Sequence, residues 1–328
     1  MSSTPLFATG RHEISPAAAE AARTSGIDPQ TLFARHEHGD WGDAPEWLRR
    51  DNANATALDS SFHAIRSHYK IGEQVEFVVV SARGRDRTRL QLASEYTSRE
   101  VSVQEGYAAW AETYHYYNPL IAVEEPAVES LLGTFPLPAS AIDIGTGTGR
   151  LARLLARRGV PEVLGLDATP EMLAVARATA QEEGLTGLRF ALASLGEAPL
   201  PIAADTFEML TCGLMLTHVP NLRDAIRECV RVVKPGGRLL LTDFHPATAV
   251  FGWRTDFVTP DCVYLMPNGP NTREDYLEGL TDAGCDLLEV QDIALDGRPY
   301  GDLSEAAMRA NGLPPLCLVI LAQKRLPA

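Results

Sequence analysis

The sequence predicts an α/β fold in which a mostly parallel sheet, with helices on both faces, follows a small α+β domain. The first sign is AIDIGTGTGR at 141–150, an apolar strand that runs into alternating glycines and an amphipathic helix. A second apolar strand, EVLGLD, ends in Asp167 and precedes another helix. The third sign is RECVRVVKPGGRLLLTD, a helix, a glycine turn and a buried strand. Strands that alternate with helices in this way build parallel sheets.

The length of the chain limits the number of domains, and its charge limits the class of partner. A chain of 328 residues suits two domains of ~150 residues each, which we place at 1–98 and 99–328. The formal net charge is −14, and most of the excess acid lies after residue 100. Such a chain is a poor electrostatic match for a nucleic-acid backbone, so we expect no nucleic-acid partner.

The expected location is the cytoplasm. The first residues, MSSTPLFATGRHEISP, lack the apolar core of a secretory signal. No apolar run approaches the ~18 residues of a membrane span, so we expect no membrane partner. The five cysteines form no C-x-x-C pair, which favours reduced and mostly buried thiols.

The first domain is predicted to combine helices and strands. Residues 16–24 are alanine-rich and predict a helix, with Pro16 in its first turn and Gly26 near its end. DPQTLFARHEHGDWGD predicts a second short helix that runs into a loop. Residues 62–96 predict strands, with a hairpin turn at ARGRD.

Four arginines recur at every second position from Arg83 to Arg89. On a straight strand all four would share one face. One interpretation is a patch for phosphates or another acidic partner; the other, which we favour, is a solvated hairpin tip balanced by nearby carboxylates. The histidines of this domain lack the spacing of a metal site, so no metal is expected.

Residues 15–97 resemble small uncharacterised plasmid-associated bacterial proteins that share the pattern LLARHxxGDWGD, here LFARHEHGDWGD. The resemblance implies no activity. Three roles are open for this domain: dimerisation, a wall of the site, or partner binding. We favour assembly, as the contact of a homodimer.

The glycine loop narrows the choice of ligand. A Walker loop needs a lysine that is absent here, and a dinucleotide loop needs a third glycine where Arg150 stands. Asp143 ends the strand, and a carboxylate beside the ligand suits an ammonium group and repels a pyrophosphate. S-adenosylmethionine (SAM) fits that asymmetry, and glycines let the backbone approach its bulky sulfonium.

The next strand supplies the second half of the signal. Asp167 stands at its tip, where an acid can accept two hydrogen bonds from ribose hydroxyls. Thr169 is expected to cap the following helix, with Pro170 at its first position. Met172 falls where it could cover the adenine. Two strand-tip acids with a glycine loop after the first predict SAM.

The stretch 103–326 resembles the class I SAM-dependent methyltransferases, specifically the small-molecule branch of the methyltransferase 11/25 type. AIDIGTGTG matches the first motif of that family, VLGLDATPEML the acidic strand, and KPGGRLLLTD the late turn and fifth strand. The resemblance implies a Rossmann-like seven-stranded class I methyltransferase sheet with helices on both faces. It also implies SAM as the cofactor and S-adenosylhomocysteine as the product.

The expected cofactor contacts come from an aromatic helix, the two strand tips, the glycine loop and the ends of the third and fourth strands. They are Tyr107, Tyr114, Asp143, Gly145, Thr146, Gly147, Asp167, Ala168, Met172, Ser194, Leu195, Cys212 and Leu214. Most relatives carry an acid against the adenine amine after the third strand. Here Ser194 and Leu195 stand near that place, and Glu197 could substitute.

Residues 99–135 are expected to form a helical lid segment. Tyr107, Trp110, Tyr114 and Tyr117 fall on one helix face. A core stripe would look the same, but the resembled family places this helix over SAM. An aromatic face also stabilises a sulfonium by cation–π attraction, on the order of 1 kcal/mol.

Methyl transfer is an in-line displacement, to which a protein contributes mainly positioning and desolvation. A base is required only when the nucleophile arrives protonated. The catalytic candidates follow the fourth and fifth strands: His218, Asp243 and His245. The alternative for each histidine is a structural role in its turn.

Residues 246–272 form a long insertion that we expect to be a substrate lid. Its aromatic residues predict a flat or apolar acceptor, although a satellite core would look the same. The predicted function is methyl transfer from SAM to a small molecule. The alternatives are a macromolecule (protein or RNA) methyltransferase and a non-catalytic SAM-binding regulatory protein. The sequence does not separate O-, N- and C-methylation.

Overall fold

The computed structural model describes residues 4–57, 64–114, 118–196 and 198–327. The chain folds into two compact units. The first contains residues 1–101 and 256–266, and the second contains residues 102–255 and 267–328. The first boundary lies close to the expected position after residue 98, but a short later segment returns to the first unit.

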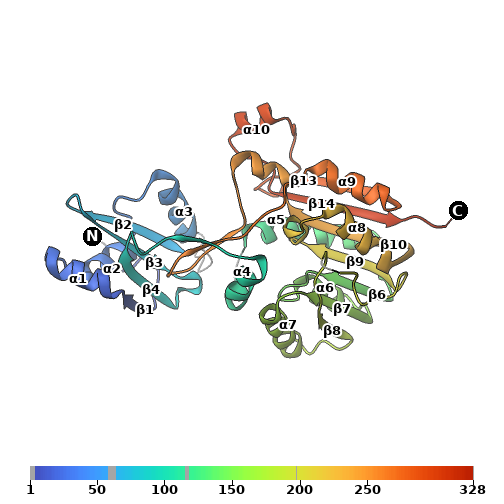
Figure 1. The fold of residues 1–328 in the computed structure, drawn as a ribbon, viewed down its shortest axis with the longest axis horizontal. Coiled ribbons are helices and arrows are strands. Elements are labelled where there is room, and N and C mark those ends of the chain that lie inside the picture. Colours follow the sequence, from blue (N-terminus) through green and yellow to red (C-terminus); the bar gives the residue numbers. More distant parts are fainter. Residues whose placement is uncertain (1–3, 58–63, 115–117, 197, 328) are drawn as a thin grey trace. The chain divides into compact units, whose positions relative to one another are not determined.

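The first unit is built on a four-stranded sheet with the order β1-β4-β3-β2 (Figure 1). Its strands are β1 (Arg11–Ile14), β2 (Ile65–Ile71), β3 (Val75–Ser81) and β4 (Arg87–Leu92), and its helices are α1 (Pro16–Ser25), α2 (Pro29–Glu37) and α3 (Glu46–Ala57). The predicted α+β character is confirmed. The sequence signals neither β1 nor α3, because β1 has only four residues and α3 contains few apolar ones.

Helices α1 and α2 contribute to the core of this unit. The Ser15 side chain accepts a hydrogen bond from the Ala18 N–H, and Pro16 occupies the first turn, as predicted. Gly26 ends α1 with φ of 66°, a left-handed value that glycine adopts without a Cβ penalty. Among the described residues of this unit, the larger of two buried clusters consists of Ala18, Ala22, Leu32, Phe33, Tyr69, Phe77, Val79 and Leu90, and the smaller consists of Trp41, Ala44, Leu48 and Ile65.

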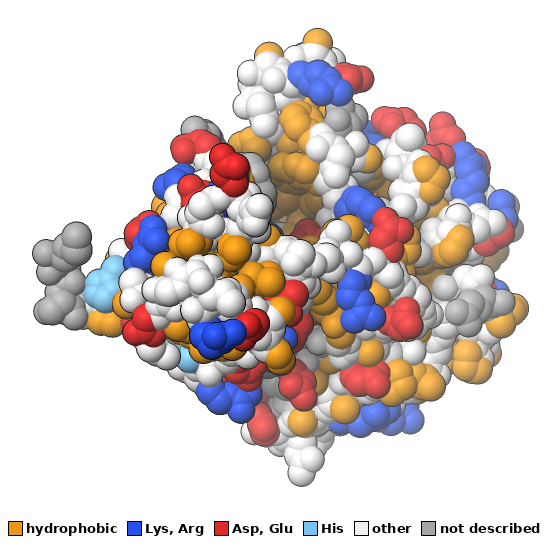
Figure 2. Space-filling model, turned by 60° about the vertical axis from the view of Figure 1, so that its left-hand side comes forward, with side chains coloured by type: hydrophobic (Ala, Val, Ile, Leu, Met, Phe, Trp, Pro, Cys, Tyr) orange, Lys and Arg blue, Asp and Glu red, His pale blue; other side chains and the backbone are white. Residues whose placement is uncertain are grey.

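The four arginines do not share one strand face, which agrees with the favoured interpretation of a hairpin turn balanced by carboxylates. Arg83 and Arg85 lie in a 3₁₀ turn in which Gly84 has φ of 78°, and only Arg87 and Arg89 lie in β4. The turn interrupts the two-residue period of the strand. Arg85 is buried, and Arg87 and Arg89 pair with carboxylates. On the face drawn in Figure 2, basic and acidic side chains are interspersed rather than gathered in one basic patch.

The second unit contains a seven-stranded sheet with the order β13-β14-β10-β9-β6-β7-β8 (Figure 1). Its strands are β6 (Ser140–Ile144), β7 (Glu162–Asp167), β8 (Leu188–Leu192), β9 (Phe207–Gly213), β10 (Val233–Phe244), β13 (Cys285–Ile293) and β14 (Cys317–Lys324). Its α-helices are α4 (Val103–Trp110), α5 (Pro119–Leu132), α6 (Arg150–Arg157), α7 (Pro170–Glu182), α8 (Leu222–Val232), α9 (Arg273–Asp282) and α10 (Glu305–Asn311). Strand β14 runs antiparallel to both of its neighbours, β13 and β10, and the other neighbouring pairs of this sheet are parallel. The predicted seven-stranded α/β fold is confirmed.

Helices cover both faces of this sheet, and the strand period sorts the core between them. Leu239 and Leu241 of β10 belong to a buried cluster that includes Ile226 of α8. Leu240, between them, belongs to a second cluster that includes Val128 of α5 and Leu155 of α6. Successive side chains of a strand point to opposite faces, which explains why β10 is apolar throughout its centre.

The segment expected to be one substrate lid is divided between the units. Strands β11 (Asp256–Val258) and β12 (Val263–Leu265) form a hairpin, and β12 adds in parallel to β5 (Ser98–Glu100). Residues 256–266 therefore fold with the first unit, whereas both flanks belong to the second. Pairing with β5 satisfies one edge of β12, which a mobile lid would leave open.

Two features are absent from the residues that the structure describes. None of their helices is both long and apolar enough to cross a membrane. Within the same ranges, no group of three or more His, Cys, Asp or Glu side chains is arranged to hold a metal ion. All five cysteines are buried free thiols.

Candidate functional site

A cavity of about 400 Å³ lies at the carboxyl ends of β6, β7 and β9. Ligands bind at this edge in open α/β sheets. The predicted cofactor residues that line it are Tyr107, Tyr114, Gly145, Gly147, Asp167, Ala168, Met172, Ser194, Leu195 and Leu214. The lining also includes Ser102, Val103, Gln104, Ile144, Thr169, Ala193, Gly196, Gly213, Met215, His218, Val219, Pro220 and Pro267. Asp143, Thr146 and Cys212 do not line it, and Glu197 lies outside the described residues.

The glycines of the loop are required for two different reasons. Gly145, Gly147 and Gly149 all have positive φ, at 69°, 54° and 81°. A Cβ on Gly145 would lie 2.5 Å from Cγ of Met215, whereas a Cβ on Gly147 would meet no heavy atom within 4 Å. Gly147 also lines the cavity. One glycine therefore allows the loop to pack, and the other leaves space for a ligand.

Asp143 supports the loop and does not face the cavity, so its expected contact with the SAM ammonium is wrong. Its carboxylate accepts hydrogen bonds from the hydroxyls of Thr146 and Thr211, each at 2.6 Å, and from the Ala152 N–H at 3.2 Å. Burial raises its pKa to about 6. The hydrogen bond from the Thr146 hydroxyl to Asp143 explains why Thr146 is buried and does not line the cavity. Cys212 is fully buried in the strand.

Asp167 does face the cavity, as predicted. One carboxylate oxygen accepts the Gly147 N–H at 2.7 Å, and the other accepts the Thr169 N–H at 2.8 Å. Each oxygen has a second acceptor site, so ribose hydroxyls can bind without displacing these bonds. Burial raises the pKa of Asp167. Asp167 thus links the glycine loop, the start of α7 and the ligand space.

Helix α4 presents its aromatic face to the cavity. Ser102 and Glu105 form a capping box that starts the helix, and Ser102 itself lines the cavity. The Tyr107 ring stacks on Trp110 at 5.9 Å and meets Tyr114 edge-on at 5.9 Å. Tyr117, the last member of the predicted stripe, lies outside the described residues.

His218 lies beside this aromatic cluster with a defined tautomer. Its Nδ1 lies 2.8 Å from the Pro267 carbonyl oxygen, which can only accept, so Nδ1 carries the proton. Nε2 lies 3.0 Å from the Tyr107 hydroxyl and must accept from it. Burial lowers the pKa of His218, which favours the neutral ring. An unprotonated imidazole nitrogen therefore lies at the wall of the cavity.

A second cavity, of about 480 Å³, lies behind that wall. Thr217 and Asn268 line the second cavity, whereas their chain neighbours His218 and Pro267 line the first. The Gly269 N–H donates to the Thr217 carbonyl at 2.6 Å and joins the two segments. The second cavity is also lined by Phe244, His245, Pro246, Ala247, Thr248, Ala249, Trp253, Gly269, Pro270, Asn271, Thr272, Arg273, Glu274, Tyr276 and Leu303.

The structure contradicts a direct catalytic role for His245. Its Nδ1 accepts the Ala247 N–H at 3.1 Å, so Nε2 carries the proton and donates to Asp292 at 3.0 Å. Asp292 also accepts two hydrogen bonds from Arg273, at 2.7 and 3.0 Å. Both ring nitrogens of His245 are therefore engaged, and no lone pair is available for a substrate proton.

Asp243 is also withdrawn from the ligand space. It is 1% exposed and lines neither cavity. Its carboxylate accepts from the Thr217 N–H and the Tyr276 hydroxyl, both at 2.7 Å, and from the Phe244 N–H at 2.8 Å. Burial raises its pKa to about 7. Its position holds the 217–218 wall on β10, so its expected role as a catalytic group is wrong.

Several residues at the site escaped the sequence analysis. Met215 packs where a Gly145 side chain would stand, and Pro267 fixes the His218 tautomer. Glu124 of α5 is fully buried and bonds to Arg150 and Thr242. Burial raises the pKa of Glu124. None carries a local motif; the position of Arg150 in place of a third glycine was the one available signal.

The cavity fits SAM by its chemistry. Asp167 provides an acceptor for ribose hydroxyls, and apolar side chains such as Met172 and Leu195 suit an adenine ring. Tyr107 and Tyr114 provide aromatic rings, which attract a sulfonium. A volume of about 400 Å³ lies in the ordinary range of ligand pockets, ~300–1,000 Å³.

Known proteins resemble the same part of the chain. A family model described as a methyltransferase domain matches residues 142–241. The methyltransferase GfsG of Streptomyces halstedii is 30% identical over 187 residues, which cover 56% of this chain and 66% of that protein. A ubiquinone biosynthesis O-methyltransferase of Xanthomonas axonopodis pv. citri is 30% identical over 164 residues, covering 47% and 66%. The solved structure of YcgJ from Bacillus subtilis is 24% identical and covers 62% of this chain and all of that chain, with a TM-score of 0.47.

The chain spans just under two thirds of the length of these two curated relatives. The matched residues 142–241 run from β6 into β10 and contain the glycine loop, Asp167 and His218. The family match, the strand order of the sheet and the side chains that line the first cavity agree with one another. The second unit is a class I SAM-dependent methyltransferase domain.

Proposed function

We propose that this chain transfers the methyl group of SAM to a hydroxyl group of a small-molecule acceptor, with His218 as the base. The observation that carries the proposal is the His218 tautomer, which the Pro267 carbonyl fixes with the Nε2 lone pair toward Tyr107. A neutral imidazole in this state can take a proton from an acceptor hydroxyl.

The second cavity supports a small acceptor. It lies across the 217–218 wall from the first cavity and is large enough for the body of an acceptor whose hydroxyl reaches into the first cavity, where His218 lies. Trp253 stacks on Phe244 with an interplanar angle of 12°, which offers a flat apolar surface. Among the described residues, the buried Nδ2 of Asn271 has no hydrogen-bond partner. It would suit a carbonyl or phenolic oxygen of the acceptor.

The protein groups have separate roles in this reaction. SAM, when bound, supplies an electrophilic methyl group on a sulfonium. The acceptor hydroxyl takes the place of the Tyr107 hydroxyl at Nε2 of His218 and gives up its proton there. Nδ1 of His218 keeps its proton and still donates it to the Pro267 carbonyl, which holds the ring in place. Tyr107 and Tyr114 cover the ligand space and exclude water.

The test is His218→Asn, with Tyr107→Phe as the matched control. Asparagine can still donate to the Pro267 carbonyl but cannot take a proton, so transfer should fall ~10²–10⁴-fold with little change in SAM affinity. Tyr107→Phe keeps the ring and removes the competing hydroxyl, so it should retain activity. An unchanged rate in His218→Asn would show that His218 is not the base.

The acceptor class is tested by transfer from radiolabelled SAM into a host-cell extract separated into metabolite, nucleic-acid and protein fractions. Label in the metabolite fraction supports a small acceptor, and its chromatographic position begins to identify the compound. Label in a macromolecular fraction contradicts this proposal. Calorimetry with SAM alone tests the cofactor independently of any acceptor.

A further inference from the structure

The hairpin of β11 and β12 leaves the methyltransferase domain and folds with the first unit. It is held there by its backbone and by buried side chains. The Val263 N–H donates to the Thr97 carbonyl, and the Val101 N–H donates to the Leu265 carbonyl, both at 3.1 Å. Phe257 is buried and stacks on Tyr264 of the opposite strand at 4.6 Å.

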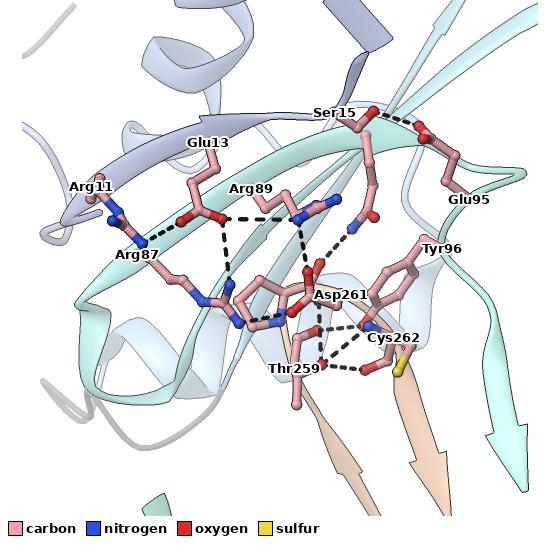
Figure 3. Close-up of polar contacts among 12 residues, drawn as sticks. Arg11, Glu13, Ser15, Arg87, Arg89, Glu95, Tyr96, Thr259, Asp261 and Cys262 are labelled. Carbon is pink, nitrogen blue, oxygen red and sulfur yellow. Dashed lines mark hydrogen bonds and ion pairs between the residues drawn. The ribbon is translucent and has the colours of Figure 1, made fainter. Parts of the chain in front are cut away.

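A polar cluster fixes the tip of this hairpin (Figure 3). The Asp261 carboxylate pairs with Arg87 and Arg89 of β4, each at 2.8 Å. Glu13 of β1 pairs with Arg87 at 3.4 Å from the other side. We call Glu13, Arg87, Arg89 and Asp261 the arginine clasp. Its carboxylates pair with the two arginines of β4, which favours the interpretation of a basic hairpin balanced by nearby carboxylates over that of a phosphate patch.

The tip has a shape that suits this clasp. Pro260 and Asp261 stand at the centre of a tight turn closed by a hydrogen bond from the Thr259 N–H to the Cys262 carbonyl at 3.0 Å. The turn directs its carbonyls toward the first unit, where Gln91 donates to Pro260 and Tyr96 donates to Thr259. The contacts are thus made by the turn backbone as well as by its charge.

Both ends of the hairpin continue directly into the walls of the two cavities. On one side, Trp253 lines the second cavity. On the other, Pro267 lines the first cavity and Asn268 the second. The Thr255 N–H donates to Oδ1 of Asn268 at 3.1 Å and joins the two strands at the base of the hairpin. Residues 256–266 are therefore joined through the backbone, at both ends, to segments that line the cavities.

We infer that the arginine clasp positions the acceptor side of the site, so that the first unit acts as the anchor for the cavity walls. The role of the walls in acceptor binding rests on the proposed function. The clasp residues touch neither cavity; they act through the hairpin on Pro267, whose carbonyl holds His218. Of the three roles that the sequence left open for the first domain, this inference favours a contribution to the site over dimerisation and partner binding.

The test compares Asp261→Ala with Asp261→Glu in the full-length protein with SAM present and needs no acceptor. Hydrogen exchange, read by mass spectrometry, reports on residues 256–266 and on the flanks 246–255 and 267–272. Nitrogen NMR of imidazole reports the His218 tautomer, assigned with the His218→Asn variant. In Asp261→Ala we expect faster exchange in the hairpin and both flanks, and loss of the pure Nδ1-protonated state. Asp261→Glu should restore both.

Arg11→Ala is the matched control. Arg11 pairs with Glu13 at 2.5 Å, whereas the ion pairs of Asp261 are made with Arg87 and Arg89. It should leave both signals unchanged. Faster exchange confined to 256–266, with an unchanged His218 spectrum, would overturn the inference, since the hairpin would then be held without any effect on the site. Neither readout depends on turnover, so failure of the base assignment and failure of the anchor are distinguishable.

Discussion

At the residue scale, Asp167 both builds the cavity and faces it. We expect Asp167→Ala to weaken SAM binding by roughly 1.5–3 kcal/mol, the worth of hydrogen bonds to a charged acceptor. Titration calorimetry measures this directly. Glu171→Ala is the control, because Glu171 lies exposed in the first turn of α7 and does not line the cavity. Unchanged affinity in Asp167→Ala would remove the ribose assignment.

Asp243 gives a prediction about pH. Its folded pKa is about 7, raised by burial from the ordinary value of 3.8. A carboxyl with a raised folded pKa contributes stability that is complete below its unfolded pKa and is lost as the pH rises through its folded pKa. Chemical denaturation from pH 4 to 7 should therefore show a loss on the order of a few kcal/mol attributable to this group.

Asp243→Asn cannot ionise and should reduce this slope, although Asn offers one acceptor fewer to its three donors and is expected to be less stable at low pH. Asp143, whose pKa is raised to about 6, contributes a slope of the same sign in the same window and is the internal comparison. An identical slope in Asp243→Asn and the native chain would show that Asp243 is not the titrating group.

At the element scale, two glycines of the same loop have different roles: Gly145 packs against Met215, and Gly147 leaves space for the ligand. Gly147→Ala adds a side chain at φ of 54° with no atom within 4 Å, so it should cost only ~1–2 kcal/mol of unfolding free energy. Gly145→Ala has a similar φ and also places Cβ 2.5 Å from Met215, so it should cost clearly more. Denaturation without cofactor ranks the two, and equal costs would contradict the close contact.

The same loop shows what a sequence can indicate. The strand, the glycines and Asp167 were predictable because their pattern is local and each residue type serves a single geometric need. The orientation of Asp143 was not, because its hydrogen bonds to Thr146 and Thr211 depend on the neighbouring strand. His245 failed for a similar reason, since its partner Asp292 comes from β13. The hairpin at 256–266 carries no signal for its distant partner β5.

At the scale of the whole molecule, removal of residues 1–98 tests how far the units depend on each other. The lining of the first cavity comes entirely from the second unit, so SAM affinity should change less than about tenfold, or 1.4 kcal/mol. The hairpin would lose Arg87, Arg89 and most of its backbone partners, so its amides should exchange quickly. Loss of SAM binding in calorimetry would show that the first unit completes the cofactor cavity.

The hairpin also affects how the chain must fold. Arg87 and Asp261 are 174 positions apart in the chain. The first unit is therefore not complete until most of the second has been synthesised, although domains generally fold in order from the N-terminus. Closing a contact over such a long loop is slow compared with forming local structure. The sequence of the first unit is not continuous, because residues 256–266 are encoded within that of the second. Recombination that replaces the first unit by a homologous copy must therefore also replace this hairpin.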